Sequence, residues 1–342
     1  MDYYAGIDVS LKSSSIAVVN AHGEIVREAK VASDPISLIE WFRSCGLPMT
    51  RIGLEAGPWS QWLYAALKKA GFAVELLETR HVRNAFKTMA VKTDRKDARG
   101  IAELVRVGWY RPVHCKSLDA QETRVMLAAR RLVDQKLGDV EMTLRGLLRN
   151  FGLKVGKTTP TRFADRIKEL VSGHATLQII AESLLAVHEV LLRELKALEK
   201  RVRRIARDSA DARLLMTATG VGPIIALTYA AGIDDPARFK SSKTVGSYFG
   251  LAQKKYQSGE TDITGRISKA GDASVRTALY QAAHIMLTRP VKASKLRTWA
   301  LQLAKRVGMK KAKVALARKL AVVMHRMLVD GKPFNPALGA AA

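Results

Sequence analysis

The stretch YYAGIDVSLKSSSIAVVNAHGEIVREAKV, residues 3–31, decides the fold that we predict for the N-terminal part of the chain. Runs rich in Val, Ile and Tyr occupy residues 3–9, 14–20 and 24–31, and short turn segments separate them. Such runs are typical of β-strands when turn residues, here Ala21-His22-Gly23, lie between them. The stretch therefore predicts that the chain begins with three consecutive strands.

Helices and further strands alternate after this stretch. The pattern predicts a helix at 35–46, a strand at 51–55, a helix at 58–69 and a strand at 72–77. Ser33 or Asp34 is the expected cap of the first helix, and Pro58 suits the first turn of the second. The order β-β-β-α-β-α-β implies an α/β domain in which helices flank a mixed sheet.

Long helices are predicted beyond the sheet. One covers residues 119–150, and residues 177–205 carry a strict 4-3 spacing of core positions. These positions are Leu177, Ala181, Leu184, His188, Leu191, Leu195, Leu198, Val202 and Ile205. Four such heptads predict a coiled coil, formed either between subunits or by folding back on helix 119–150. We interpret His188 as a polar residue that sets the register rather than as a ligand.

The C-terminal part is predicted to be mostly α-helical, with two basic helices near its end. Thr219-Gly220-Val221-Gly222-Pro223 has the form of a helix-hairpin-helix turn, in which amides near Gly220 and Gly222 bind a phosphate. A turn of small residues that serves packing is the alternative. We expect three domains, at residues 1–115, 116–210 and 211–342.

The chain is strongly basic. Its 342 residues include 57 Lys and Arg against 31 Asp and Glu, a net charge of +26, of which +18 lies beyond residue 200. This charge predicts binding to DNA or RNA rather than a merely solvated basic surface.

Cys45 and Cys115 form no CxxC pair, which argues against a disulfide framework or a cysteine zinc site. We find no basic leader and no apolar run near membrane length, so we expect a cytoplasmic protein without a membrane partner.

Four acidic residues mark the ends of predicted elements: Asp8, Glu55, Asp94 and Asp97. Asp97 lies on the side of its helix that carries the apolar stripe, and Asp94 lies one turn before it. Carboxylates of this kind are ligands for Mg²⁺, with Mn²⁺ as the alternative ion, and paired ions can clamp the oxygens of a phosphodiester. The structural alternatives are a helix cap for Asp94 and a helix-dipole role for Asp97.

Two sets of cations are candidates for nucleic-acid contacts. Arg124, Arg131, Arg145 and Arg149 form one stripe on helix 119–150, which either tracks a phosphate backbone or is a solvated face. The second set, on residues 254–276, is Lys254, Lys255, Arg266, Lys269 and Arg276. Hydroxyls and glycines alternate with this second set, which suits a phosphate held by cations while a hydroxyl attacks it. Ser258 and Tyr256 are both candidate nucleophiles, and a plain substrate-binding loop is the alternative.

The ordered set of motifs resembles the transposases of the insertion-sequence one-hundred-and-ten family, which are also described as bridge-RNA-guided recombinases. The motifs span nearly the whole chain: Gly6-Ile7-Asp8, Leu54-Glu55-Ala56, Lys92-Thr93-Asp94 through Asp97-Ala98, Gly220-Val221-Gly222, Phe249-Gly250-Leu251, Tyr256-Gln257-Ser258-Gly259 and Ser268-Lys269-Ala270-Gly271. The chain departs from the family's usual pattern at Gly57-Pro58, where Thr-Gly is common, and at Gln253, where proline is common.

The resemblance implies an N-terminal RuvC-like, RNase H-type domain joined to a C-terminal domain with a nucleophilic serine. It assigns the four-acid metal site to Asp8, Glu55, Asp94 and Asp97, and the serine to Ser258. It further implies Mg²⁺-dependent cleavage through a serine–DNA link, exchange between donor and target double-stranded DNA, a structured guide RNA, and a homo-oligomer of two to four subunits associated with the nucleoid.

Three other functions fit parts of the same sequence. A RuvC-like Holliday-junction resolvase uses the same four acids with water as the nucleophile. An ATPase of the sugar-kinase and actin type has a related strand order, but its paired glycine-rich phosphate loops have no counterpart here. A non-catalytic RNA-binding protein derived from a recombinase needs neither the acids nor Ser258.

Overall fold

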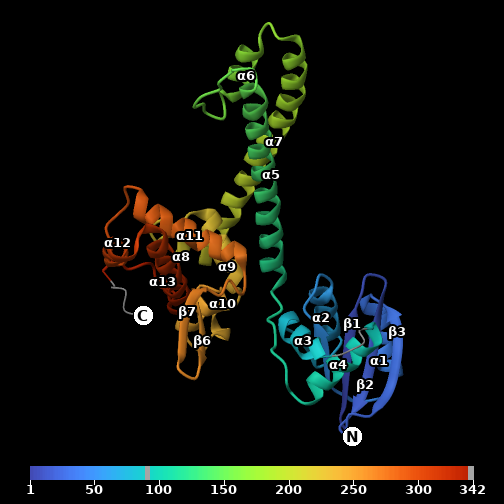
Figure 1. Cartoon of the computed structure of the whole chain (residues 1–342). Helices are drawn as coiled ribbons and strands as arrows, with labels where there is room; N and C mark the ends of the chain where they lie inside the picture. Colours follow the sequence, from blue (N-terminus) through green and yellow to red (C-terminus); the bar gives the residue numbers. More distant parts are fainter. Residues whose placement is uncertain (89–92, 338–342) are drawn as a thin grey trace. The chain divides into compact units, whose positions relative to one another are not determined.

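A computed structural model describes residues 1–88 and 93–337 of the chain (Figure 1). The chain forms two compact units, Met1–Lys116 and Ser117–Ala342. The predicted division of the second unit at residue 210 stays a prediction. Lys92, which belongs to one of the motifs quoted above, lies outside the described residues.

The first unit is built on a five-stranded mixed sheet. Its strands are β1 (Tyr3–Val9), β2 (Ser13–Asn20), β3 (Ile25–Ala32), β4 (Met49–Glu55) and β5 (Val74–Leu77). Their order is β3-β2-β1-β4-β5, with antiparallel pairing from β3 to β1 and parallel pairing from β1 to β5. The α/β class and the mixed sheet expected from the sequence are therefore confirmed.

Helices lie on both faces of this sheet. On one face, α1 (Pro35–Ser44) and α2 (Ser60–Lys69) bury the apolar side chains of β1 and β4. On the other face lies α4 (Asp94–Arg106), preceded by α3 (Thr79–Ala85) and a short 3-10 turn, Phe86–Thr88. The sequence patterns did not predict α3.

Three predicted boundaries in this unit are corrected or refined. Asp34, rather than Ser33, caps α1, because its Oδ1 accepts from the Ser37 amide at 2.9 Å. The helix predicted from residue 58 begins at Ser60, whose Oγ bonds both backbone groups of Gly57 and so closes a separate turn. The strand predicted from residue 72 begins at Val74, because the Phe72 amide still bonds the Leu67 carbonyl at the end of α2.

Two glycines let α4 approach the sheet closely. A Cβ at Gly6 would come within 2.1 Å of the Ala98 carbonyl oxygen, and one at Gly53 within 2.5 Å of Val105 Cγ1. Both distances are far below van der Waals contact, so only glycine fits beneath the helix at these positions. The Gly6-Ile7-Asp8 motif thus has a packing requirement immediately before its acid.

Replacing Gly6 by alanine is expected to lower the free energy of unfolding of the full chain by about 3 kcal/mol, because the new methyl group must displace backbone of α4. Chemical denaturation followed by far-UV circular dichroism measures this change. Gly57→Ala is the matched control, since a Cβ at Gly57 would meet no atom closer than 4.0 Å. Equal stability of both variants would contradict the close packing of α4 on β1.

The second unit begins with a long helical hairpin. Its helices are α5 (Leu118–Arg149), α6 (Phe163–Val171) and α7 (Ala175–Asp208). Leu144 and Leu148 of α5 share one core with Leu177, Ala181 and Leu185 of α7. The predicted repeat therefore folds back on α5 within the chain, with Leu185 buried in place of the predicted Leu184.

The contacts of His188 bear on its predicted role as a polar residue that sets the register. His188 is buried, its Nε2 lies 3.1 Å from Glu141 Oε1, and its ring packs 5.1 Å from that of Phe163. These contacts fit a polar residue of the helical core.

The statement that no apolar run approaches membrane length is wrong for α7. This helix is long and apolar enough to cross a membrane by length and composition, although a single such helix is weak evidence for a membrane.

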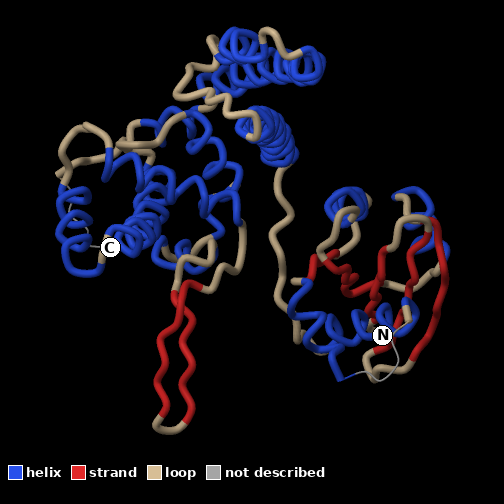
Figure 2. Tube along the Cα trace, turned by 45° about the horizontal axis from the view of Figure 1, so that its top comes forward, coloured by secondary structure: helices blue, strands red, loops and turns tan. Residues whose placement is uncertain are grey.

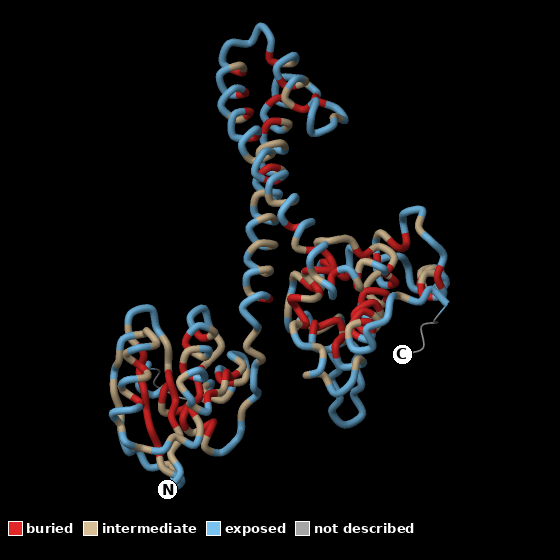
Figure 3. The backbone as a smooth tube through the Cα atoms, turned by 180° about the vertical axis from the view of Figure 1, so that it is seen from behind, coloured by how far each residue is buried: buried red, intermediate tan, exposed pale blue. Residues whose placement is uncertain are grey.

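The rest of the second unit is a helical bundle from which one hairpin of strands projects (Figure 2). Its elements are α8 (Ala210–Met216), α9 (Pro223–Ile233), the 3-10 turns Pro236–Arg238 and Ser242–Thr244, α10 (Val245–Tyr248), β6 (Gln253–Ser258), β7 (Thr261–Ile267), α11 (Ala273–Thr288), α12 (Lys295–Val307) and α13 (Met309–Asp330). Buried residues concentrate in the helices, whereas β6 and β7 are exposed almost throughout (Figure 3). The helical character of this part is confirmed, but the β-hairpin was not predicted.

Candidate functional site

The register of the sheet places Asp8 and Glu55 next to each other. β1 and β4 are parallel with Ile7 opposite Leu54, so the following residues, Asp8 and Glu55, are neighbours at the carboxyl ends of their strands. Side chains alternate along a strand, so both acids share the face of Gly6 and Gly53, which is the face covered by α4.

The first turn of α4 carries the other two acids to the same end of the sheet. Ala98 of α4 lies over Gly6, while Arg51 near the start of β4 donates from Nη1 to the Val105 carbonyl near the end of α4. The helix therefore begins at the carboxyl ends of β1 and β4. Asp94 and Asp97 occupy its first turn, where carboxylates also favour the helix dipole.

A cap role for Asp94 is excluded by the observed hydrogen bond. Thr93 is the N-cap of α4, with its Oγ1 accepting from the Lys96 amide at 3.2 Å. Asp94 is exposed and lines a hollow of about 550 Å³ above β2 and β3. Ser15, the cross-strand neighbour of Asp8, lines the same hollow. The strand neighbour of Asp8 and the first residue of α4 thus line the same hollow.

The backbone placement and the donor chemistry suit a divalent metal, but the side-chain conformations do not form a metal cage. Carboxylate oxygens are the ligands that Mg²⁺ prefers, and all four candidates supply them. Within residues 1–88 and 93–337, however, no three Asp, Glu, His or Cys side chains are arranged to hold an ion together. The structure thus brings the four acids to one end of the domain without joining their oxygens around a point.

An ion-pair cluster that the sequence patterns did not reveal fixes the start of α4. Glu28 of β3 accepts from Arg99 Nε at 2.6 Å and is also paired with Arg95. Arg95 and Arg99 are four residues apart, so they lie on one side of the helix, in the same two turns as Asp94 and Asp97. The i, i+4 pair of arginines was a signal available in the sequence. Their partner, Glu28, lies 67 residues from Arg95, so local patterns could not identify it.

The Glu28 cluster makes stability depend on acid. Hydrogen bonds from Arg99 and Arg95 lower the pKa of the Glu28 carboxyl from 4.5 to about 2. A carboxyl whose pKa falls on folding stabilises the folded state above its unfolded pKa and loses that contribution as the pH drops through its folded pKa. Between pH 4.5 and pH 2 the wild-type chain is expected to lose stability more steeply than Glu28→Gln. Urea midpoints at each pH measure the difference, and parallel curves would show that the cluster contributes nothing.

Ser258 lies at the free end of the β6–β7 hairpin. It pairs with Thr261 across a two-residue turn formed by Gly259 and Glu260. Every residue from 253 to 266 is exposed, so the hydroxyl is presented to solvent on an arm without a core of its own. Such a position suits a group that must reach a large substrate.

The two faces of the hairpin differ in chemistry. Tyr256 and Ile263 are directly paired and, with exposures of 63% and 59%, form an apolar pair on the same face as Ser258. On the opposite face Asp262 is bonded by Lys255 at 3.2 Å and by Gln257 at 3.1 Å. Lys255 is therefore already paired within the arm, whereas Lys254, Arg266 and Lys269 are exposed.

The base of the hairpin is fixed by close backbone packing. Gly250 and Gly271 both have positive φ, and a Cβ at Gly250 would lie 1.9 Å from the Ala270 carbonyl oxygen. Arg276 donates from Nη1 to the carbonyls of Phe249, Ala270 and Gly271 at 2.9–3.2 Å. The sequence suggested Arg276 as a phosphate contact, but in the structure its guanidinium joins the two chain segments that carry the arm.

Arg276→Lys is expected to lower the free energy of unfolding by about 2 kcal/mol, because an ammonium at the end of a lysine cannot replace the guanidinium among the three carbonyls. Thermal and urea unfolding of the full chain measure this loss. Arg326→Lys serves as the control, since Arg326 forms an exposed ion pair with Asp330 one helical turn away. Weaker DNA binding at unchanged stability would instead favour a phosphate contact for Arg276.

The arginine stripe on α5 is largely used for contacts inside the second unit. Arg124 is paired with Asp272, the N-cap of α11, and Arg131 donates to Ser274 Oγ at 3.0 Å. Burial is the largest single influence and raises the pKa of the Asp272 carboxyl. The hydrogen bond and charge of Arg124, together with the hydrogen bonds from the Val275 and Ser274 amides, outweigh burial and lower that pKa. Arg145 donates to the Gly156 carbonyl at 2.6 Å and to Thr158 Oγ1 at 3.1 Å. Arg149 is exposed.

The two glycines in the turn between α8 and α9 differ in how closely other atoms pack against them. A Cβ at Gly220 would lie 2.8 Å from the Ala282 carbonyl of α11, so this glycine serves close packing. Gly222 is the N-cap of α9, and a Cβ there would meet no atom within 4 Å. The phosphate role suggested for this turn stays a prediction, in which Gly222 is the accessible residue.

Comparisons with known proteins agree with these features. Residues 212–297 match the model of the Transposase IS116/IS110/IS902 family, and residues 5–152 match a Transposase model of the IS110 type named for its DEDD acids. The chain thus belongs to the class of DNA transposases. The chain is a member of the IS110 family of transposases.

Relatives and solved structures show the extent of the similarity. The transposase for insertion sequence element IS1111A of Coxiella burnetii is 25% identical over 338 residues, covering 96% of this chain and 90% of the relative. The probable family 20 transposase of Pseudomonas aeruginosa is 26% identical, covering 97% and 98%. The solved structure of RuvC from Thermus thermophilus in complex with a Holliday junction substrate is 15% identical, with a TM-score of 0.26, and covers 33% of this chain and 100% of that chain.

Proposed function

We propose that this transposase cleaves and rejoins DNA strands through a covalent serine–DNA intermediate formed by Ser258. The observation that carries the proposal is the exposed hydroxyl at the end of the β6–β7 arm, in a chain whose other unit gathers four carboxylates at one end of its sheet. The proposal requires both units to act on the same phosphodiester.

Each side chain has a defined part in the proposed reaction. Ser258 Oγ attacks the scissile phosphorus, the Oγ–P bond forms, and the P–O bond to the departing strand breaks. The proton of Ser258 is released and the departing oxygen takes one up. The serine ester conserves the energy of the phosphodiester, so a hydroxyl of a new strand reverses the step without ATP.

Asp8, Glu55, Asp94 and Asp97 would hold Mg²⁺, or Mn²⁺ in its place. A bound divalent ion supplies Lewis-acid polarisation of the phosphate and neutralises charge that develops during its transfer. The acids must turn toward one another to do so, because no such cage exists in the described part of the chain. Their common location at the end of the sheet supports this assignment.

We also propose that donor and target DNA are selected with a structured guide RNA and that the active form is an oligomer of two to four subunits associated with the nucleoid. The net charge of +26 supports a nucleic-acid partner but does not choose between DNA and RNA. To test for a guide RNA, the protein is expressed from its own element and any RNA that copurifies with it is sequenced.

The decisive experiment traps the intermediate. The full chain is incubated with double-stranded element ends in Mg²⁺, denatured, and digested, and the DNA-bearing peptide is identified by mass spectrometry. We expect the adduct on Ser258. Cleavage without any protein–DNA adduct would favour a resolvase that uses water, and an adduct on Tyr256 would move the nucleophile two residues along the same strand.

A further inference from the structure

The last three helices have a one-sided charge. Residues 273–330, which include α11 to α13, contain thirteen Lys and Arg and a single acid, Asp330, which pairs with Arg326. The apolar faces of these helices pack into the core of the second unit. Most of these cations therefore lie on the solvent side, where the segment supplies a single acid to neutralise them.

One face of α12 forms a continuous polar row. Lys295, Thr298, Gln302 and Lys305 follow one another at intervals of three, four and three, so they share a face of the helix, and all four are exposed. The opposite face buries Leu296 and Ala300. At 1.5 Å per residue the row extends about 15 Å along the helix.

The turn between α12 and α13 extends this row with further cations. Arg306 adjoins Lys305, and Lys310 and Lys311 begin α13 after Gly308. All are exposed, and none of these four cations forms an ion pair with a residue that the structure describes. Four unneutralised cations within seven residues have the charge density that a phosphate backbone binds.

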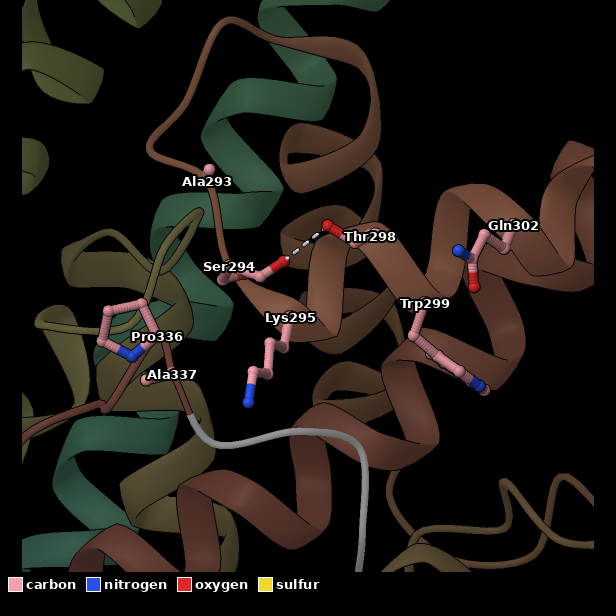
Figure 4. Close-up of a pocket in the computed structure, with 8 residues that line it drawn as sticks. All are labelled: Ala293, Ser294, Lys295, Thr298, Trp299, Gln302, Pro336 and Ala337. Carbon is pink, nitrogen blue, oxygen red and sulfur yellow. Dashed lines mark hydrogen bonds between the residues drawn. The ribbon is translucent and has the colours of Figure 1, made fainter.

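A hollow opens beside the other end of the row. It measures about 520 Å³, and Figure 4 shows Lys295, Thr298, Trp299 and Gln302 of α12 around it, with Pro336 and Ala337 on the other side. Lys319 Nζ lies 4.7 Å from the centroid of the Trp299 ring, a cation–π contact that holds the indole in place. An aromatic ring, an amide and a lysine amine together offer stacking, hydrogen bonds to a base edge and a phosphate contact.

We infer that the α12 row and the α12–α13 turn bind the backbone of an unpaired nucleic-acid strand, with one base seated in the hollow beside Trp299. An unpaired strand is favoured over a duplex, because bases stacked inside a double helix cannot enter a side pocket without being extruded. DNA and RNA share the phosphodiester that the cations recognise. The inference goes beyond the proposed chemistry and does not depend on Ser258 or on a metal.

Binding of fluorescent 20-mers to the full chain in EDTA tests the site, with oligo-dT, oligo-rU and a DNA duplex as probes. The variant K305Q/R306Q/K310Q/K311Q is expected to weaken single-strand binding at least tenfold near 0.15 M salt. It should also reduce the slope of log K against log salt by about 3 for four lost contacts. The preferred single strand, dT or rU, assigns the ligand as DNA or RNA.

A charge-matched control removes four cations that already have acidic partners. K136Q/R166Q/R193Q/R204Q changes the net charge equally, but each of these side chains is exposed and ion-paired on its own helix. We expect less than a threefold effect on any probe. Equal weakening by both variants would overturn the site, because net charge alone would then explain the binding.

The hollow is tested with Trp299. Trp299→Ala is expected to weaken both single strands about tenfold and the duplex less than twofold, and Trp299→Phe should retain most of the affinity. Circular dichroism melting tests whether each variant is folded. If Trp299→Ala does not fold, Trp299→Phe, which keeps an aromatic ring in the same packing, remains as the test variant. Equal losses for duplex and single strands, or unchanged single-strand binding in folded Trp299→Ala, would overturn the assignment of an unpaired base to this hollow.

Discussion

Ser258→Ala is expected to abolish the protein–DNA adduct and to lower strand exchange by about 10⁴-fold or more, the size of effect seen when an enzyme loses its nucleophile. The change removes only the hydroxyl at the end of an exposed hairpin, so the fold and DNA affinity should be retained. Gel analysis of denatured reactions measures adduct and exchanged product in one assay.

Two neighbouring hydroxyls provide controls for this experiment. Thr261 is the cross-strand partner of Ser258, and Tyr256 lies on the same face of β6. Thr261→Ala and Tyr256→Phe should both keep the adduct if Ser258 is the nucleophile. An adduct that survives Ser258→Ala but disappears in Tyr256→Phe would reverse the assignment, and cutting by Ser258→Ala without an adduct would indicate a water-using resolvase.

Asp97→Asn is expected to lower DNA cleavage in Mg²⁺ by about 10³-fold, because metal assistance to phosphoryl transfer contributes several kcal/mol. The same variant should also lose the rise in melting temperature that Mg²⁺ gives to the wild type, since a bound ligand stabilises only the folded state. The second readout separates a metal ligand from a residue that acts at another step.

Glu40→Gln is the matched control for the acidic site. Glu40 is exposed on α1, on the sheet face opposite α4, and its replacement also removes one negative charge. Full activity is expected. If Asp97→Asn were as active as Glu40→Gln, and Mg²⁺ stabilised both equally, the four acids would not form a metal site.

The first unit was predictable because its signals are local. Runs of strand-forming residues separated by turns in 3–31 predict the first three strands, and strand-end positions mark Asp8 and Glu55 before any coordinates are known. Their adjacency, in contrast, depends on the pairing of Ile7 with Leu54, 47 residues apart in the chain, and on a helix packed over Gly6. Long-range pairing is information that local periodicity does not carry.

The second unit shows where sequence patterns are ambiguous. A 4-3 repeat is equally satisfied by a partner helix of another subunit and by α5 of the same chain, and the structure shows the internal pairing. The β6–β7 hairpin was missed because residues 253–266 have no buried face, so no alternation of apolar residues reveals its strands. The carbonyl contacts of Arg276 were missed for a related reason: a cation beside glycines is compatible with a phosphate contact and with a backbone clamp, and its role as a phosphate contact stays a prediction.

The coreless arm that carries Ser258 has a consequence for the safety of the host genome. A two-stranded ribbon without buried side chains is marginally stable in water, so we expect the end that carries Ser258 to sample many orientations until a substrate holds it. Restraining it consumes binding energy that only an extensive, correctly matched complex supplies. In the proposed reaction, accidental encounters with chromosomal DNA would thus seldom end in a nick, and fidelity would come from an arm without a core rather than from a rigid catalytic pocket.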